Sequence, residues 1–318
     1  MLRYIARRLV AAVPIIVGIT FFVFLIINLA PGDPVAMMIN PNRPLSPAAM
    51  MARREALGLN KPLLVRYVLW LGEVARGNLG YSLVNQQPVL ERIAQRVPPT
   101  VQLMGTALLI GTVVGVTLGV LSAVYQYSLL DHVATFLAFL GVSSPSFFLG
   151  LGGIYLLSLK LNLFPTAGMD TLGAPFSVLD RLHHLILPAL VLSVGTTASL
   201  MRYTRSSMLE VIAQDYVMTA RGKGVSERTI VIRHVLRNAL LPVITVLGLS
   251  IPLVFAGAVI TEQIFQWPGI GMLTIQAVTA RDYPVLMGIL MMSAILIIIF
   301  NLVSDVAYAF LDPRIRFD

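Results

Sequence analysis

Cysteine is absent from the sequence and charged residues are scarce, since only 12% of the 318 residues are Asp, Glu, Lys or Arg. The absence of cysteine excludes disulfides, thiolate chemistry and cysteine-ligated metal sites. An ordinary soluble domain carries about a quarter of its residues as charged side chains. Together with a hydrophobic content of 57%, the scarcity of charge predicts a chain that folds in lipid.

Motifs for catalysis and nucleotide binding are also missing. A phosphate-binding loop needs Gly-x-x-x-x-Gly-Lys followed by Ser or Thr, whereas the nearest string, Gly222-Lys223-Gly224-Val225, lacks both the spacing and the hydroxyl. No Gly-x-Ser-x-Gly or His-Glu-x-x-His string occurs, and the four histidines are scattered. We therefore expect no catalytic, cofactor-binding or metal-binding residues, and a pump built on this chain would need an energy source in another subunit.

Six long apolar blocks recur along the chain. Each is near the length of about 20 residues that crosses the hydrocarbon core of a bilayer as a helix, and none contains Asp, Glu, Lys or Arg. The first block follows a basic start that resembles a signal peptide, but the later blocks favour an uncleaved span. The sequence thus predicts an all-α membrane protein with six transmembrane helices, at about 9–30, 101–125, 133–159, 185–201, 241–261 and 286–304.

Basic residues concentrate between and beyond these blocks. Short cytoplasmic segments are rich in Lys and Arg, and the start, the segment between the fourth and fifth spans, and the tail share this enrichment. With six spans these three segments lie on one side, so both termini are expected in the cytoplasm. The basic residues, which give a net charge of +8, are not interleaved with aromatics, so we expect no nucleic-acid partner.

The long segment 31–100 is predicted to be an external helical cap. Ser46 and Pro47 open a short helix that stops near Gly58, and 61–76 is amphipathic before Gly77. The apolar side chains on one side of this second helix are Leu64, Val65, Val68 and Leu69. Both a plain cap and a substrate-docking surface fit this pattern. The predicted division is therefore 1–30 (terminus and first span), 31–100 (cap) and 101–318 (transmembrane core with a cytoplasmic loop at about 202–240).

That cytoplasmic loop is the most informative segment. Two helical stretches are interrupted at Gly222 and Gly224, where the backbone can take positive φ and turn sharply. The pattern predicts a helix–turn–helix elbow. A collar of positive charge with a glycine turn and an elbow that docks an acidic groove of a partner ATPase both fit these residues.

Other features bear on alternative functions. The spans lack the carboxylates and histidines with which secondary transporters often move protons, and Glu262 and Asp305 are expected at the membrane interface. Sodium sites made of backbone carbonyls would leave no trace in the sequence.

Pro145 is expected to kink the third span, for packing or as a gate. The string Trp267-Pro-Gly-Ile-Gly271 fits a re-entrant turn or an aromatic belt residue.

The loop also resembles a known family. Its strings Asp215-Tyr-Val-Met-Thr-Ala-Arg-Gly-Lys-Gly-Val-Ser-Glu227 and Leu236-Arg-Asn-Ala-Leu-Leu-Pro242 resemble the signature loop of the peptide/nickel branch of ATP-binding-cassette importer permeases, in particular the dipeptide or oligopeptide B type. Further matching strings, in order along the chain, are Pro31-Gly-Asp-Pro34, Leu57-Gly-Leu-Asn-Lys-Pro62, Gly77-Asn-Leu-Gly-Tyr-Ser82, Gly141-Val-Ser-Ser-Pro-Ser-Phe147, His184-Leu-Ile-Leu-Pro188, Trp267-Pro-Gly-Ile-Gly271, Arg281-Asp-Tyr-Pro284 and Asp312-Pro-Arg314.

The resemblance implies a type I importer permease fold in a bacterial or archaeal cytoplasmic membrane. It also implies partners: a second homologous permease, two ATP-binding subunits and an external solute-binding protein, with short peptides as the commonest cargo and nickel, glutathione or opines as others. The residues implied to form the ATPase-coupling helix are Thr219, Ala220, Arg221, Gly222, Lys223, Gly224, Val225 and Ser226. Met218-Thr-Ala220 replaces the usual Glu-Ala-Ala, and Leu241-Pro242 comes later than usual. An ion-coupled secondary transporter or a membrane scaffold is the alternative.

Overall fold

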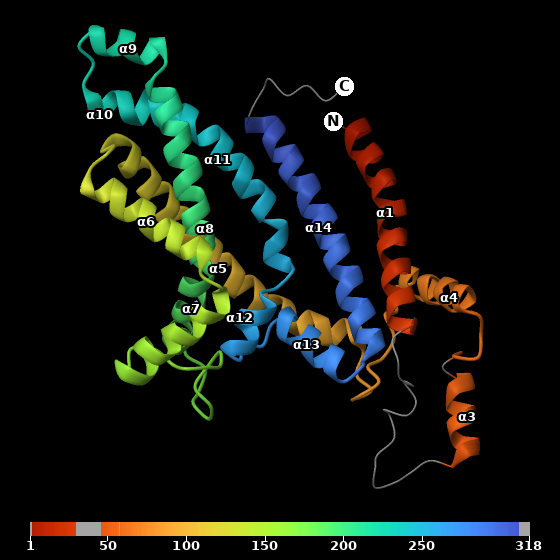
Figure 1. Ribbon diagram of the computed structural model, residues 1–318. Coiled ribbons are helices and arrows are strands. Elements are labelled where there is room, and N and C mark those ends of the chain that lie inside the picture. Colours follow the sequence, from red (N-terminus) through yellow and green to blue (C-terminus); the bar gives the residue numbers. More distant parts are fainter. Residues whose placement is uncertain (1, 30–45, 57, 312–318) are drawn as a thin grey trace. The chain divides into compact units, whose positions relative to one another are not determined.

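The computed structural model describes residues 2–29, 46–56 and 58–311. The chain divides into two compact units, unit 1 (Met1–Pro98 with Gly269–Asp318) and unit 2 (Pro99–Pro268). The regular elements of the described residues are helices (Figure 1). They are α1 (Leu2–Leu29), α3 (Pro47–Ala56), α4 (Leu63–Ala75), α5 (Val89–Val124), α6 (Leu129–Ser143), α7 (Ser146–Gly153), η1 (Ile154–Lys160), α8 (Val178–Ile212), α9 (Asp215–Gly222), α10 (Glu227–Thr229), η2 (Ile230–Leu236), α11 (Arg237–Ser250), η3 (Pro252–Phe255), α12 (Val259–Ile264), α13 (Ile270–Thr279) and α14 (Tyr283–Leu311).

Among the described residues, five helices have the length and apolarity of membrane spans, and the predicted six are reached when one bent pair of helices is counted as a single span. Five are continuous: Val10–Leu29, Val89–Val124, Val178–Ile212, Glu227–Phe255 and Tyr283–Val303. The sixth is the pair Leu129–Ser143 and Ser146–Lys160, bent by 106°. The kink expected at Pro145 is present as a full break in the helix, because Pro145 has no amide hydrogen to donate and Ser144 before it is extended with ψ of 127°.

The fifth span ends earlier than predicted. The helical run stops at Phe255, after the 3₁₀ turn that begins at Pro252. Gly257 then turns the chain with φ of +80°, and Thr261 belongs to the separate short helix α12. Pro252 and Gly257 therefore end the helix before residue 261, where the apolar stretch in the sequence ends.

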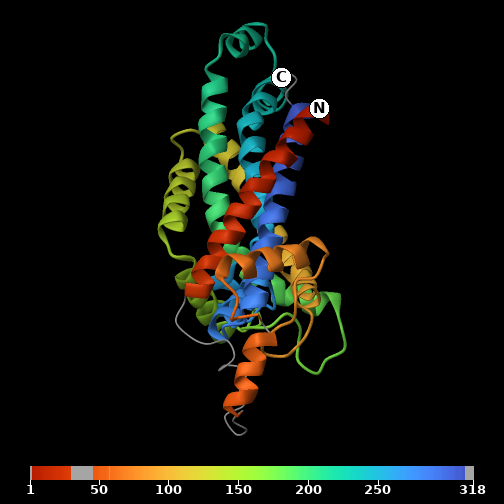
Figure 2. The same cartoon turned by 90° about the vertical axis from the view of Figure 1, so that its right-hand side faces the viewer.

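Unit 1 is built on α1 and α14, which lie side by side and run in opposite directions (Figure 2). The α4 helix packs across α1 through a cluster centred on Phe24, Tyr67 and Met287. A second cluster joins α13 and α14 to the start of α5. At Gly288 in α14 a Cβ atom would come within 2.5 Å of Val89, so the helices approach closely because this residue has no side chain.

Unit 2 is held by a close contact between α5 and α8. Gly111, Gly115 and Gly119 lie four residues apart and therefore on one face of α5. A Cβ atom on Gly115 would lie 2.7 Å from the carbonyl oxygen of Thr197 in α8. Small residues at this spacing let helix backbones meet, a common means of packing in membranes.

The described part of the predicted cap contains the two expected helices. The Oγ atom of Ser46 accepts a hydrogen bond from the Ala49 amide at 3.3 Å, and Gly58 and Gly77 take φ of +66° and +82° after α3 and α4. The strings Pro31-Gly-Asp-Pro34 and Asp312-Pro-Arg314 lie outside the described residues.

Candidate functional site

The predicted elbow is present as α9 and its flanking turns, residues 213–229, called here the elbow. The α8 helix ends at Ile212, Gln214 is extended with ψ of 145°, and α9 runs across the direction of α8 at one end of unit 2 (Figure 1). Asp215 lies in the first turn of α9 and Arg221 in the last, an arrangement that complements the helix dipole. The glycine pair thus lies where α9 ends.

The turn after α9 is a Schellman motif. The Val225 amide donates to the Ala220 carbonyl at 3.2 Å, and the Gly224 amide donates to the Arg221 carbonyl at 2.9 Å. This motif needs a residue in the left-handed region at the position of Gly224, whose φ is +78°. Gly222 is the last residue of α9, so of the two glycines only Gly224 is required by its conformation.

One apolar side chain fixes α9 to the body of unit 2. Val217 is fully buried (0% exposed) and packs in a cluster with Met208 of α8 and Ile230 of η2. Ala220 and Val225 pack partly against the same cluster. The elbow therefore packs against both α8, which precedes it, and η2, which follows it.

The eight predicted coupling residues divide into two faces. Ala220 and Val225 are half-buried, and the other six are exposed. The exposed residues are Thr219, Arg221, Gly222, Lys223, Gly224 and Ser226. A small-residue surface with two cations therefore faces away from unit 2.

Arg221 is held in place by Glu227 across the turn. Its Nε and Nη2 atoms donate to the two carboxylate oxygens of Glu227 at 2.8 and 3.3 Å. This hydrogen bonding raises the pKa of Arg221. Because both side chains are exposed, the pair orders the turn more than it stabilises the fold.

A buried ion pair that the sequence did not reveal fixes α8 behind the elbow. Asp131 of α6 is 2% exposed and accepts hydrogen bonds from Nε and Nη2 of Arg205 at 2.7 and 2.8 Å. Arg205 belongs to the basic segment between the fourth and fifth spans, and its local sequence does not indicate a partner. The available signal was Ser128 followed by Asp131, a helix start, since the Ser128 Oγ accepts from the Asp131 amide.

Two residues near the fifth span are buried in unit 2. Glu262 is fully buried and accepts a hydrogen bond from the Thr100 hydroxyl at 3.1 Å, and its expected place at the membrane interface stays a prediction. Trp267 is also fully buried and donates through Nε1 to the Pro99 carbonyl at 2.8 Å. Trp267 is therefore a core residue of unit 2, which excludes an aromatic belt role on the surface of this chain.

Pro145 is not brought to the elbow. It precedes α7, and Figure 1 places α7 and α9 at opposite ends of unit 2. Within the described residues no group of three or more His, Asp or Glu side chains is placed to hold a metal ion. The elbow is thus the one predicted site whose residues the fold assembles.

Comparison with known proteins gives concordant matches. Residues 115–317 match the family model described as binding-protein-dependent transport system inner membrane component, and residues 1–104 match the model for the N-terminal part of such membrane components. A peptide permease protein of Brucella suis biovar 1 (strain 1330) is 48% identical over 317 residues, covering 99% of each chain. The oligopeptide transport system permease protein AppB of Bacillus subtilis (strain 168) is 46% identical over 318 residues, covering 100% of each.

A solved structure supports the fold. A chain of the MetNI methionine ABC transporter in an inward-facing conformation superimposes with a TM-score of 0.55 at 15% sequence identity. The match covers 70% of this chain and 97% of that chain. At this identity the likeness concerns the fold alone, and it agrees with the predicted type I importer permease architecture.

Proposed function

This chain belongs to the family of binding-protein-dependent transport system inner membrane components, and we propose that it forms half of the path by which an ATP-driven importer moves short peptides. The cargo is supported by relatives named for peptide and oligopeptide transport that match along their full length. The chain itself is a multi-pass inner membrane permease and not a catalyst.

The observation that carries the proposal is the elbow. A transmembrane subunit without a nucleotide site must receive its energy through a surface that an ATPase can push. The exposed face of α9 with Arg221 and Lys223 offers such a surface, and the buried Val217 passes its displacement to α8 and η2. The eight residues Thr219, Ala220, Arg221, Gly222, Lys223, Gly224, Val225 and Ser226 form the coupling helix in this proposal, and the cations meet acidic side chains of the partner.

The proposed assembly contains a second, homologous permease, two ATP-binding subunits and an external solute-binding protein. The membrane is the bacterial, or archaeal, cytoplasmic membrane, with both termini and the elbow in the cytoplasm and the 31–100 segment outside. ATP-driven closure of the ATPases displaces the elbows of both permeases and turns the spans outward to receive the peptide. Pro145, at the break between α6 and α7, is a proposed bending point in that motion.

The test is replacement of the glycine that the Schellman motif requires. Gly224→Val places a β-branched residue at φ of +78°, which such residues rarely adopt. We expect peptide uptake and peptide-stimulated ATP hydrolysis by the purified complex in proteoliposomes to be lost, while membrane insertion stays normal. The matched control is Gly77→Val, because Gly77 has a similar φ of +82° and no atom within 4 Å of a Cβ atom but lies outside the elbow.

Three outcomes contradict the proposal. Normal uptake by the Gly224→Val complex would remove the elbow from the mechanism. Uptake driven by an ion gradient without ATP would instead make the chain a secondary transporter. A chain that purifies alone after cross-linking, without an ATPase or a second permease, would favour a membrane scaffold.

A further inference from the structure

The α4 helix of unit 1 is apolar on two opposite faces. One face carries Tyr67, Trp70 and Leu71, which pack against α1 in the cluster with Phe24. The other face points away from the described residues: Leu64, Val65, Val68 and Leu69 are all at least 44% exposed. The sequence pattern predicts these four residues as the apolar side of an amphipathic helix, and in the structure they form its uncovered side. A helix that is apolar nearly all round is typical of a buried or membrane environment.

The contacts of α4 place it alongside α1 and not beyond its end. The Tyr67 hydroxyl donates to the Val17 carbonyl at 2.9 Å and lies 2.9 Å from the Thr20 hydroxyl. Val17 precedes the end of α1 at Leu29 by about three turns, or roughly 18 Å. Val10–Leu29 has the length and apolarity of a membrane span, and α4 therefore lies alongside the second half of an apolar run that is suited to lipid.

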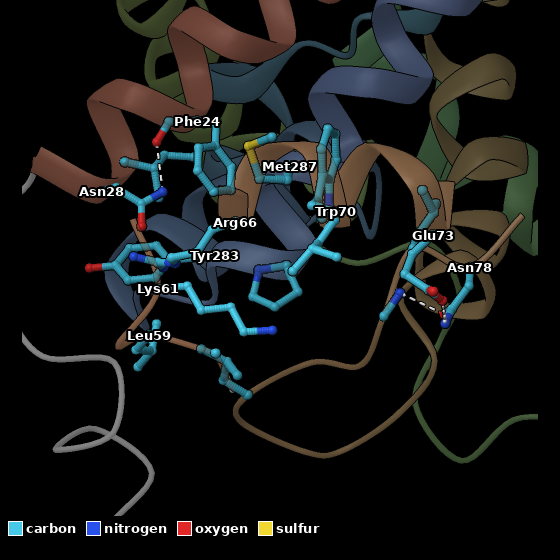
Figure 3. Close-up of a pocket in the computed structure, with 17 residues that line it drawn as sticks. Phe24, Asn28, Leu59, Lys61, Arg66, Trp70, Glu73, Asn78, Tyr283 and Met287 are labelled. Atoms are coloured by element: carbon cyan, nitrogen blue, oxygen red, sulfur yellow. Dashed lines mark hydrogen bonds between the residues drawn. The ribbon is translucent and has the colours of Figure 1, made fainter. Parts of the chain in front are cut away.

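A pocket of about 330 Å³ adjoins α4. Its walls come from the end of α1, the 58–61 turn, α4 and the start of α14 (Figure 3). Lys61 and Arg66 lie near Tyr283 at one end, and Glu73 lies beside Asn78 at the other (Figure 3). The pocket therefore joins a cationic end to apolar and aromatic walls.

The two cations have no carboxylate partner among the described residues, whereas the carboxylate is already bound. Glu73 accepts hydrogen bonds from Asn78 at 2.9 Å and Arg76 at 3.1 Å. The Arg66 guanidinium lies 5.9 Å from the centre of the Phe24 ring, and its burial lowers the pKa of this residue. A half-buried arginine without a counter-ion is suited to an anionic ligand.

We propose that α4 lies in the outer leaflet, with Leu64, Val65, Val68 and Leu69 among the acyl chains, and that Lys61 and Arg66 hold the phosphate of a phospholipid in the adjoining pocket. Lipid fits better than a protein partner for two reasons. The α4 helix packs against the stretch of α1 from Phe21 to Ile27, and Phe22 and Ile26 in this stretch are exposed as well. A phosphate above acyl chains also matches cations beside an apolar face, the pattern of helices that lie in membrane interfaces.

The first experiment measures what surrounds α4. Because the sequence contains no cysteine, Val68→Cys and, as an aqueous reference, Asn85→Cys each give this chain one spin-label site in the purified complex in phosphatidylglycerol nanodiscs. We expect the label at 68 to collide with oxygen and to be shielded from a nickel chelate, and the label at 85 to meet the chelate freely. Equal access to the chelate at both sites would place α4 in water, and shielding of 68 from both agents would mean that a protein covers it. Either result overturns the proposal.

The second experiment measures lipid retention. The wild-type complex and the Lys61→Gln/Arg66→Gln complex are purified with added phosphatidylglycerol, and bound lipid is counted by native mass spectrometry. Loss of two charge-assisted contacts predicts at least about a tenfold weaker retention, with free inorganic phosphate unable to compete. The control is Arg76→Gln, an exposed cation on the same segment. Retention equal to that of the wild type would remove the pocket as a lipid site, and competition by free phosphate would make it a general anion site.

Discussion

Two short helices, α9 in unit 2 and α4 in unit 1, differ in the polarity of their exposed faces. Val217 fixes α9 from the inner side while its outer face is small and charged. By contrast, α4 buries Tyr67 against α1 and leaves a second apolar face uncovered, with Val68 65% exposed. Both are joined to the spans by a few side chains, but the surface each presents suits a different solvent or partner.

This difference indicates what each helix contacts. A charged outer face is stable in water and can also pair with acidic side chains in the groove of an ATPase subunit. Such a face suits a contact that forms and is released repeatedly. An apolar outer face in water would be an exposed patch of the kind that causes association. The exposed apolar face of α4 therefore needs a cover, which in our proposal is lipid.

The largest loss of stability is expected from breaking the ion pair between Asp131 of α6 and Arg205 of α8, the helix that leads to α9. Asp131→Asn removes the charge that Arg205 faces, and breaking a largely buried ion pair from one side costs about 3 kcal/mol. Thermal unfolding of the purified complex should show a clearly lowered midpoint. The control is Asp170→Asn, whose partner Arg181 forms a similar two-point pair with Asp170 37% exposed. If both variants lowered the unfolding midpoint equally, burial would not determine how much these ion pairs contribute to stability.

A pair of identical substitutions tests the two helices directly. Val217→Ala removes fully buried methyl groups and should lower the stability of unit 2 by about 2 kcal/mol. Val68→Ala removes exposed groups and should change stability in detergent by less than about 0.5 kcal/mol. Unfolding midpoints of both variants check this. A larger loss at 68 than at 217 would mean that a protein surface covers α4.

A smaller effect is expected at the contact between α4 and α1. Tyr67→Phe keeps the ring packing but loses the bonds to Val17 and Thr20, at a cost of about 1 kcal/mol. Hydrogen exchange should become faster in α4 and remain unchanged in α9. Tyr81→Phe, at a 59% exposed tyrosine, is the control and should have no effect. Unchanged exchange in α4 would show that the aromatic cluster alone holds it.

The smallest effect is expected on the outer face of the elbow. Arg221 and Glu227 are both exposed, so their coupling in a double-mutant cycle with Arg221→Gln and Glu227→Gln should be less than about 1 kcal/mol. It should fall further at high salt, because screening acts on exposed charges. A coupling of several kcal/mol, insensitive to salt, would contradict the view that this pair only orders the turn.

Local chemistry predicted much of the fold and part of the site. Hydropathy located the six spans, and Gly58, Gly77 and Gly224 each take the positive φ expected of a glycine after a helix. The elbow was predictable because its turn depends on residues close in sequence. The break at Pro145 was located but not its angle, since a proline removes a hydrogen bond without setting the direction of the helix that follows.

Contacts between distant residues could not be predicted in this way. Asp131 and Arg205 are 74 positions apart, and nothing near either residue indicates its partner. The hydrogen bonds of Trp267 to Pro99 and of Thr100 to Glu262 are similar cases, because the string Trp267 to Gly271 fitted a re-entrant turn or an aromatic belt residue and did not indicate the contact with α5.

The sequence by itself determined that this is a membrane protein with six predicted spans, with an elbow that ends at a glycine and without a nucleotide-binding motif. These features could be predicted because span length, scarcity of charge and turn chemistry are local properties. Only the tertiary structure decided which face of α4 is uncovered, which acid holds Arg205 and which tryptophan is buried. Those outcomes depend on how helices pack, and an apolar side chain has the same hydropathy whether protein or lipid covers it.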